Sequence, residues 1–190
     1  MSQHKSSVSK NKREKRPPKK ITSSYLHNAG LYYLERFAAS KMHFRNVMLR
    51  KIKKSCAFHE EQCYEDCIKM LEDTIQAFER SGLLDDKLYA RGLAVSLRRK
   101  GFAKSMILRK MQYKGVEAQD SEIALGEHDE LLFEAEYEAA LRLVQRKKIG
   151  CYAISEKQHD EKRALGILAR AGFSYDIAKR ALSYDPDDGL

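Results

Sequence analysis

The stretch that decides the fold is MILRKM, residues 106–111, because it nearly repeats VMLRKI, residues 47–52, at an offset of 59. A second match, at an offset of 57, pairs Gly115 with Gly172 and aligns apolar residues around them. Chance similarity between amphipathic helices is the alternative explanation, and the matching glycines argue against it. Similarity at a fixed period is typical of arrays of short units that stack on their neighbours. We therefore predict three tandem three-helix repeats in a modular array.

Composition favours helices along the whole chain. Ala and Leu together number 39, whereas Val and Thr together number 7. β-branched residues lose rotamer freedom in helices and pack well in sheets, so their scarcity favours helix over strand. Proline occurs only at positions 17, 18 and 186, which leaves the 167 residues from 19 to 185 without this helix breaker. We therefore expect an all-α fold.

The formal charge of +9, from 36 Lys and Arg against 27 Asp and Glu, is concentrated at the N-terminus. Residues 1–20 hold eight bases and one acid, or +7, and the remaining residues hold 28 bases and 26 acids, or +2. Residues 2–20 contain one aliphatic side chain, Val8, and lack the apolar core of a signal peptide. We predict a disordered basic tail over residues 1–22, no membrane span and a cytoplasmic protein.

Stripes of apolar residues at helical spacing begin near Ser23. Asp85 and Asp86 are good caps for a helix that ends at Gly101. Later helices are predicted at about 104–114, 118–126, 129–148, 158–171 and 174–183. The predicted organisation is a tail over 1–22, followed by repeats over 23–82, 83–127 and 128–190.

The segment GLLDDKLYA, residues 82–90, resembles the motif that opens the second repeat of RecX family proteins. RRKGF at 98–102 and KGV at 114–116 follow in the order and spacing of that family. The segment RAGFSYDI, residues 170–177, is similar to the family's closing helix-turn-helix. One departure lies in repeat one, where the family often carries an Arg-Glu-His-Ser type turn and this chain has SKMHF at 40–44.

The resemblance covers roughly residues 25–183 and implies an all-helical fold of three repeats. It also implies a function, which is to bind the RecA recombinase, chiefly as its filament on single-stranded DNA, and to inhibit its activity in recombination and repair. No cofactor and no catalytic residue is implied. We further expect a monomer that contacts single-stranded or duplex DNA through its basic faces and tail.

The residues themselves also predict no catalysis. The sequence contains no Gly-rich phosphate loop, no His-Glu-x-x-His and no Gly-x-Ser-x-Gly motif. Asp85 and Asp86 could be taken for a general acid and base, but adjacent residues at a helix start point apart and Asp is a preferred cap. Capping is therefore the better interpretation.

Cysteine is sparse and does not suggest a disulfide framework, which fits a reduced cytosol. His59, Cys63 and Cys67 are spaced by four and would share one helix face, spread over about 12 Å. Three ligands so far apart cannot converge on one ion. We therefore expect no metal, and interpret these thiols and Cys56 as small residues that line the core.

Basic residues opposite apolar stripes are the candidate contacts. Met48 and Ile52 mark the buried side of one helix, and the charges of Arg50 and Lys51 point away from that side. The helix at 104–114 repeats this arrangement. Charge runs are often only solvated faces, but recurrence in two repeats favours a surface for phosphates or for an acidic protein groove. The predicted partner- or nucleic-acid-binding residues are Arg50, Lys51, Lys54, Arg98, Arg99, Lys100, Arg109, Lys110, Arg146, Lys147 and Lys148.

Two other functions compete with regulation of RecA. The first is a transcriptional regulator that binds DNA directly through a helix-turn-helix such as 104–126. The outer face of that segment offers few residues that read bases beyond Gln112, which disfavours it. The second is an enzyme, which the missing motifs disfavour.

Overall fold

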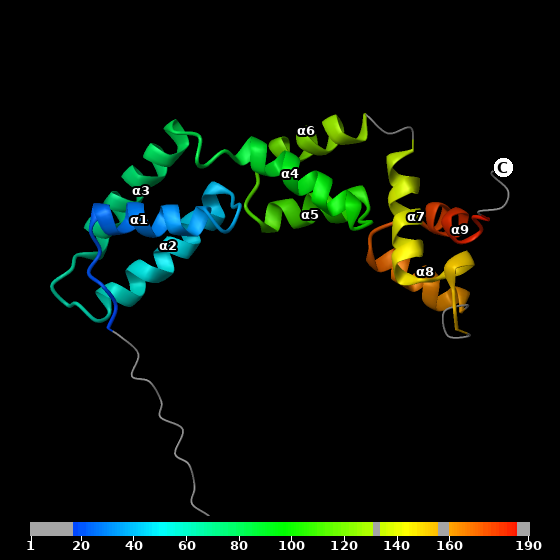
Figure 1. The fold of residues 1–190 in the computed structure, drawn as a ribbon, viewed down its shortest axis with the longest axis horizontal. Coiled ribbons are helices and arrows are strands. Elements are labelled where there is room, and N and C mark those ends of the chain that lie inside the picture. Colours follow the sequence, from blue (N-terminus) through cyan, green and yellow to red (C-terminus); the bar gives the residue numbers. More distant parts are fainter. Residues whose placement is uncertain (1–16, 131–133, 156–159, 186–190) are drawn as a thin grey trace, which may run out of the picture.

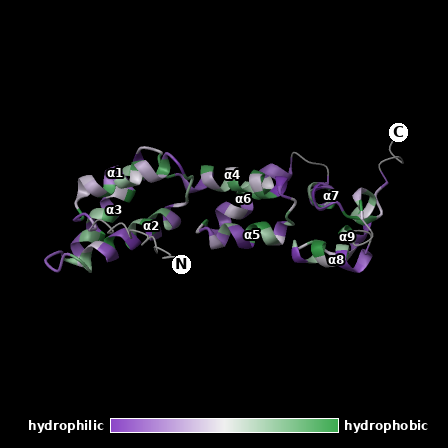
Figure 2. Ribbon diagram, turned by 60° about the horizontal axis from the view of Figure 1, so that its bottom comes forward, coloured by the Kyte–Doolittle hydropathy of each residue, from purple (hydrophilic) through white to green (hydrophobic). Residues whose placement is uncertain are grey.

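The structure, a computed structural model, describes residues 17–130, 134–155 and 160–185, and every regular element in these ranges is helical. The prediction of an all-α fold is confirmed. The helices form three groups along the long axis of the molecule (Figures 1 and 2), which we call units 1, 2 and 3. The division of the sequence into repeats at residues 82 and 127 stays a prediction.

Unit 1 contains α1 (Ser23–Leu34), α2 (Lys41–Cys56) and α3 (Tyr64–Arg80). Unit 2 contains α4 (Asp86–Arg99), α5 (Lys104–Tyr113) and α6 (Ala118–Asp129). Unit 3 contains α7 (Ala135–Lys147), a 3-10 turn η1 (Gly150–Tyr152), α8 (Glu161–Arg170) and α9 (Tyr175–Leu182). The predicted helices are present, although α6 runs on to Asp129 and α7 starts later than residue 129.

Side-chain caps explain where several helices begin. The Ser40 hydroxyl accepts a hydrogen bond from the His43 N–H at the start of α2. The Asp85 carboxylate accepts one from the Leu88 N–H at the start of α4, so its predicted role as a cap is confirmed. Each cap satisfies a backbone donor that the first turn of a helix leaves free.

Each unit encloses its own group of buried apolar residues. In unit 1, Phe44, Met48 and Ile52 of α2 are fully buried against α3. The buried clusters of units 2 and 3 come together at Phe102, which packs against both. Among the described residues, the clusters of units 1 and 2 share no such side chain. The joint between units 2 and 3 is therefore packed more continuously than the joint between units 1 and 2.

The second helices of the units meet end to end. At the first joint, between units 1 and 2, the Ser40 hydroxyl donates to the carbonyl of Lys114, just after α5. At the second joint, between units 2 and 3, the Ala103 N–H donates to the carbonyl of Ala171, just after α8, at 3.1 Å. Ser40 and Ala103 are the N-cap residues of α2 and α5. Helices α8, α5 and α2 therefore line one side of the array (Figure 2).

A carboxylate completes each joint. The Lys41 N–H at the start of α2 donates to the Asp86 carboxylate at 2.6 Å. The Lys104 N–H at the start of α5 donates to the Glu136 carboxylate, 3.2 Å from each oxygen. Acidic groups from the following unit thus satisfy free backbone donors and lie where the helix dipole favours negative charge.

Gly115 and Gly172 occupy the turns that face the two joints. Their φ angles are +84° and +94°, a region that favours glycine. A Cβ at Gly115 would lie 2.7 Å from the Met42 Cβ, and one at Gly172 would lie 2.9 Å from the Ser105 Oγ. The offset of 57 between these glycines therefore has a structural cause, because both turns press against the preceding unit.

The last residues of the predicted tail contact unit 1. Residues 1–16 lie outside the described residues, but residues 18–22 pack on unit 1, with Ile21 only 2% exposed. The Ile21 N–H donates to the Gln62 side chain, whose amide donates back to the Ile21 carbonyl, each at 2.9 Å. The sequence placed Ile21 in the tail because its partner Gln62 lies 41 residues away in the chain, and the boundary at residue 22 stays a prediction.

Candidate partner-binding surfaces

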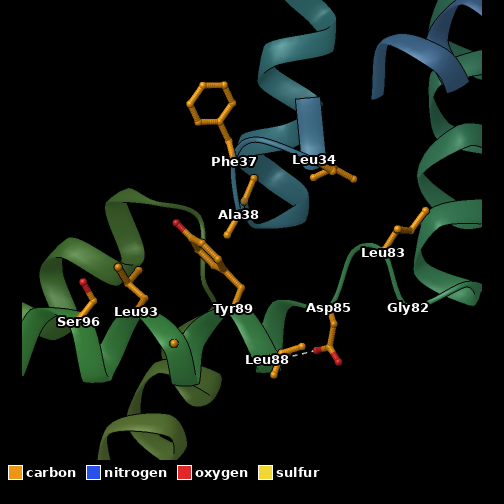
Figure 3. Close-up of a pocket in the computed structure, with 12 residues that line it drawn as sticks. Leu34, Phe37, Ala38, Gly82, Leu83, Asp85, Leu88, Tyr89, Leu93 and Ser96 are labelled. Carbon is orange, nitrogen blue, oxygen red and sulfur yellow. Dashed lines mark hydrogen bonds between the residues drawn. The ribbon is translucent and has the colours of Figure 1, made fainter. Parts of the chain in front are cut away.

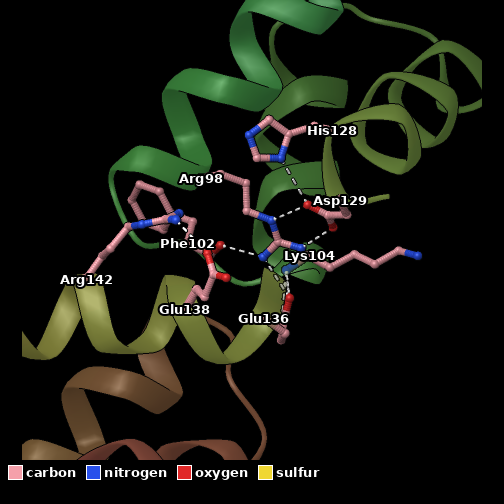
Figure 4. Close-up of polar contacts among 8 residues, drawn as sticks. All are labelled: Arg98, Phe102, Lys104, His128, Asp129, Glu136, Glu138 and Arg142. Carbon is pink, nitrogen blue, oxygen red and sulfur yellow. Dashed lines mark hydrogen bonds and ion pairs between the residues drawn. The ribbon is translucent and has the colours of Figure 1, made fainter. Parts of the chain in front are cut away.

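Arg98 is buried at the second joint (Figure 4), although the sequence placed it among the exposed basic residues. Its side chain is 1% exposed. The Nε and Nη2 groups bind the two carboxylate oxygens of Asp129, and Nη1 donates to Glu136 at 2.7 Å and to the Phe102 carbonyl at 3.1 Å. The predicted partner contact at Arg98 is therefore wrong, because the end of α4 faces unit 3 and two carboxylates hold the guanidinium.

This network fixes units 2 and 3 relative to each other. Burial opposes the charge on Arg98, but the hydrogen bonds to Asp129 and Glu136 outweigh it, so the pKa of Arg98 lies above its usual value. Glu136 also accepts from the Lys104 N–H, so a single carboxylate of α7 contacts α4 and the start of α5. We call this arrangement the Arg98 clasp.

A cleft of about 460 Å³ lies beside the second joint, where α7 and α8 meet the Phe102 turn. No Asp or Glu lines it, and its cations have no ion-pair partner in the described part of the chain. Its cationic side chains are Arg146, Lys147, Arg163 and Arg170. Its apolar lining comes from Phe102, Leu143, Ile149, Ile167 and Ala171. We call this the basic cleft.

The basic cleft brings together residues predicted separately. Lys110 lies beside it, since its Nζ is 4.6 Å from the centroid of the Phe102 ring. Sequence reasoning missed Arg163 and Arg170, which come from α8. Their spacing around Ile167, four residues and then three, could have revealed one basic face of that helix. The structure thus places Lys110, Arg146 and Lys147 next to two further cations.

The other predicted residues are exposed elsewhere on the array. Arg50, Lys51 and Lys54 lie on α2 of unit 1, at the opposite end from the basic cleft (Figure 1). Arg109 is exposed on α5. The remaining three are exposed at the ends of first helices and are Arg99, Lys100 and Lys148. The predicted set therefore forms several separate surfaces.

A second concentration of positive charge lies at the first joint. The pKa of His43 is lowered by burial and by the nearby charges of Lys114 and Arg50. Those two cations come from units 2 and 1, so the joint brings them to the same imidazole. Tyr113, beside Lys114 in the chain, is 87% exposed. The start of α2 therefore lies within reach of positive charge from both units where they meet.

An apolar groove of about 540 Å³ separates the connection between α1 and α2 from α4 (Figure 3). Phe37 and Leu88 line it and are 56% and 64% exposed. The corresponding turn at the second joint is closed, since a Cβ at Gly101 would lie 2.8 Å from the Ala139 carbonyl oxygen of α7. The first joint is therefore more open than the second.

The cysteines and His59 are arranged differently from the prediction. They do not share one helix, because α2 ends at Cys56 and α3 begins at Tyr64. Cys67 is buried with its Sγ 3.9 Å from the Cys56 Sγ, whereas Cys63 is exposed and does not line the core. Burial raises the pKa of the Cys67 thiol to about 11. In the described ranges no group of His, Cys, Asp and Glu could hold a metal ion.

None of the described helices combines the length and the apolar character that a membrane span requires. The fold defines the chain as an all-α protein of stacked three-helix units with clustered surface cations.

Comparison with known proteins identifies its family. No family model matches the sequence. The chain is 36% identical to the regulatory protein RecX of Myxococcus xanthus, over 92% of this chain and 94% of that protein. It is 27% identical to the regulatory protein RecX of Agrobacterium fabrum, over 87% of this chain and 85% of that protein. The chain therefore belongs to the RecX family, as the sequence motifs indicated.

A solved structure supports the fold. The crystal structure of RecX from Lactobacillus salivarius matches with a TM-score of 0.58 at 19% identity, over 84% of this chain and 94% of that one. At this identity the likeness concerns the fold alone.

Proposed function

We propose that the chain is a non-catalytic regulator that binds the RecA recombinase filament on single-stranded DNA and inhibits its activity in recombination and DNA repair. Membership of the RecX family supports this proposal. The structural observation that carries it is the basic cleft, which offers four cations without an ion-pair partner among the described residues, around an apolar lining. Such a surface suits an acidic protein surface that also presents an apolar side chain.

The Arg98 clasp supports binding at the basic cleft because it holds α4, α5 and α7 in one arrangement. A site on elements already fixed by packing loses less entropy on binding than a mobile one. The exposed cations of units 1 and 2 would add contacts along an extended partner such as a filament. These include Arg50, Lys51, Lys54, Arg99, Lys100 and Arg109.

The alternative, a helix-turn-helix that reads duplex DNA, is less well supported. Its recognition helix would be α6, which contains no Lys or Arg and carries Asp120, Glu122, Glu127 and Asp129. The turn before α6 also presses Gly115 against Met42 of unit 1. Acidic groups repel phosphates, so this helix is poorly suited to a DNA groove.

The test is RecA-dependent ATP hydrolysis on single-stranded DNA. We expect the wild-type chain to suppress it and to show no hydrolysis of its own. Arg146→Glu with Lys147→Glu should raise the concentration needed for half inhibition by more than about tenfold, because attraction is replaced by repulsion. Both side chains are exposed, so far-UV circular dichroism should show a folded variant.

The matched control is Lys69→Glu with Arg80→Glu, an equal change of charge at exposed positions of α3. We expect this variant to inhibit as the wild type does. Full inhibition by the Arg146 and Lys147 variant would move the binding surface away from the basic cleft. No inhibition by the wild-type chain at several-fold molar excess would contradict the proposed function itself.

A further inference from the structure

We infer that unit 1 carries a binding site for single-stranded nucleic acid, separate from the basic cleft. The site is a groove of about 540 Å³ that runs along α1 between residues 19–22 and α2. Two aromatic rings and three ammonium groups line it, those of Tyr25, Tyr32, Lys19, Lys20 and Lys51. Within the part of the chain that the structure describes, no Asp or Glu lines it. We call it the tyrosine groove.

The lysine wall of the tyrosine groove is held in place by hydrogen bonds. The Ser55 hydroxyl donates to the Lys19 carbonyl at 2.9 Å, and the His59 Nε2 lies 2.8 Å from the Pro18 carbonyl oxygen. On the other side of Lys20, Gln62 makes its two bonds to Ile21. Lys19 and Lys20 therefore project from a fixed segment of backbone.

Two of the three lysines are available to phosphates. Lys20 pairs with Glu61 at 2.5 Å. Lys19 and Lys51 have no ion-pair partner in the part of the chain that the structure describes. Residues 1–16, which lead into this segment, hold six bases and one acid, or +5. Positive charge therefore continues from the groove into the preceding chain and favours a polyanion.

The tyrosines favour exposed bases over a paired duplex. Tyr25 and Tyr32 are two helical turns apart on α1, about 10 Å along its axis, which is close to three base steps of a stacked strand. Tyr32 is 59% exposed, and the Arg36 guanidinium lies 3.7 Å from its ring centroid. Bases stack on such aromatic and guanidinium surfaces only when they are unpaired.

The basic cleft lacks these features. Its apolar lining is mostly aliphatic, and among the described residues that line it Phe102 alone is aromatic, whereas two tyrosines line the tyrosine groove. The two sites therefore differ in ligand class: the tyrosine groove suits a nucleic-acid strand and the basic cleft suits a protein. The inference does not depend on the proposed function, because the strand is recognised without a recombinase.

The experiment measures fluorescence anisotropy of a labelled oligo-dT of about 20 nucleotides, which exceeds the site size of about 4–16 nucleotides common in single-strand-binding modules. The full chain is used and no RecA is present. We expect Tyr32→Ala to weaken binding at least about fivefold. Lys19→Glu with Lys51→Glu should weaken it more than about tenfold and reduce its salt dependence.

Tyr32→Trp should retain binding, because indole also stacks on bases. The chain contains no other Trp, so quenching of this single indole by oligo-dT would report stacking at position 32. An oligo-U strand should bind within about threefold of oligo-dT, because stacking and phosphate contacts do not depend on the identity of the base or the sugar. A duplex of equal length should bind more weakly.

The matched control is Lys69→Glu with Arg80→Glu on α3, which changes the charge equally and should bind oligo-dT within about twofold of the wild type. Unchanged binding by folded Tyr32→Ala would overturn the inference. So would equal affinity for duplex and single strand, or an equal loss in the control. None of these results bears on inhibition of RecA through the basic cleft.

Discussion

Arg98→Met tests whether the Arg98 clasp holds units 2 and 3 together. The substitution removes the guanidinium but keeps an unbranched apolar stem. Asp129 and Glu136 then retain their charges at the joint, where their side chains are only 22% and 31% exposed. The Phe102 carbonyl also loses its donor. We therefore expect a loss of folding stability and a weaker joint.

The expected loss follows from burial. Removing one partner of a buried ion pair costs about 3–5 kcal/mol, because the remaining charge stays poorly solvated. Water reaches Asp129 and Glu136 in part, so we expect the lower end, about 3 kcal/mol. In a chain of this size each kcal/mol shifts Tm by about 2–4 °C, which corresponds to a fall of about 6–12 °C.

The assay is urea unfolding followed by far-UV circular dichroism, with Arg91→Met as the matched control. Arg91 makes a similar two-bond pair with Glu127, at 2.7 and 3.0 Å, but these side chains are 56% and 46% exposed. Exposed pairs contribute at most about 1 kcal/mol. Adding Asp129→Asn to Arg98→Met should restore part of the loss. Equal losses for Arg98→Met and Arg91→Met would refute the reasoning.

Three further predictions concern the joints and the tail. Gly115→Ala should lower the urea midpoint more than Gly82→Ala. Both glycines have a positive φ, which costs about 1–2 kcal/mol when Ala adopts it. Of the two, Gly115 alone has a neighbour, Met42, that a Cβ would meet. Burial raises the pKa of Asp86, so its contribution to stability falls as pH rises above about 4; Asp86→Asn, which keeps the hydrogen-bond acceptor, should remove that fall from urea titrations across acid pH. Deleting residues 1–16 should leave Tm unchanged in thermal melts, because the contacts of residues 18–21 remain.

Each of these has a result that would contradict it. Equal losses at Gly115 and Gly82 would mean that the first joint is not tightly packed at that turn. Parallel pH profiles for the wild type and Asp86→Asn would mean that the carboxyl has the same pKa folded and unfolded. A fall of several degrees on deleting residues 1–16 would show that this segment contacts the folded units.

Much of the fold could be predicted because its signals are local. The Asp85 cap and the end of α4 at Gly101 depend on residues within one turn of each other. The docking of Ile21 could not be predicted, because Gln62 is 41 residues away and nothing near Ile21 signals the contact. Local patterns also could not show that Cys56 and Cys67 lie on two helices with their sulfurs in contact.

The candidate sites were predictable only in part. Hydrophobic periodicity correctly placed Arg50 and Arg109 on exposed faces. The same periodicity failed for Arg98, because it describes one helix and not what the next unit places against it. Arg163 and Arg170 were missed because Arg170 stands alone and the Lys162–Arg163 pair is not part of the motif that recurs at 47–52 and 106–111.

By itself, the sequence determined that the chain is all-helical, that it carries its excess charge in the N-terminal segment, and that it resembles the RecX family. These properties follow from composition, short-range spacing and short motifs. The tertiary structure alone decided which cations face solvent and which grooves they line. The physical reason is that burial and ion pairing depend on contacts between residues that are distant in the chain. Asp129 and Glu136 meet Arg98 from 31 and 38 residues away. Arg163 and Arg170 line a cleft with Arg146 only because α8 packs beside α7.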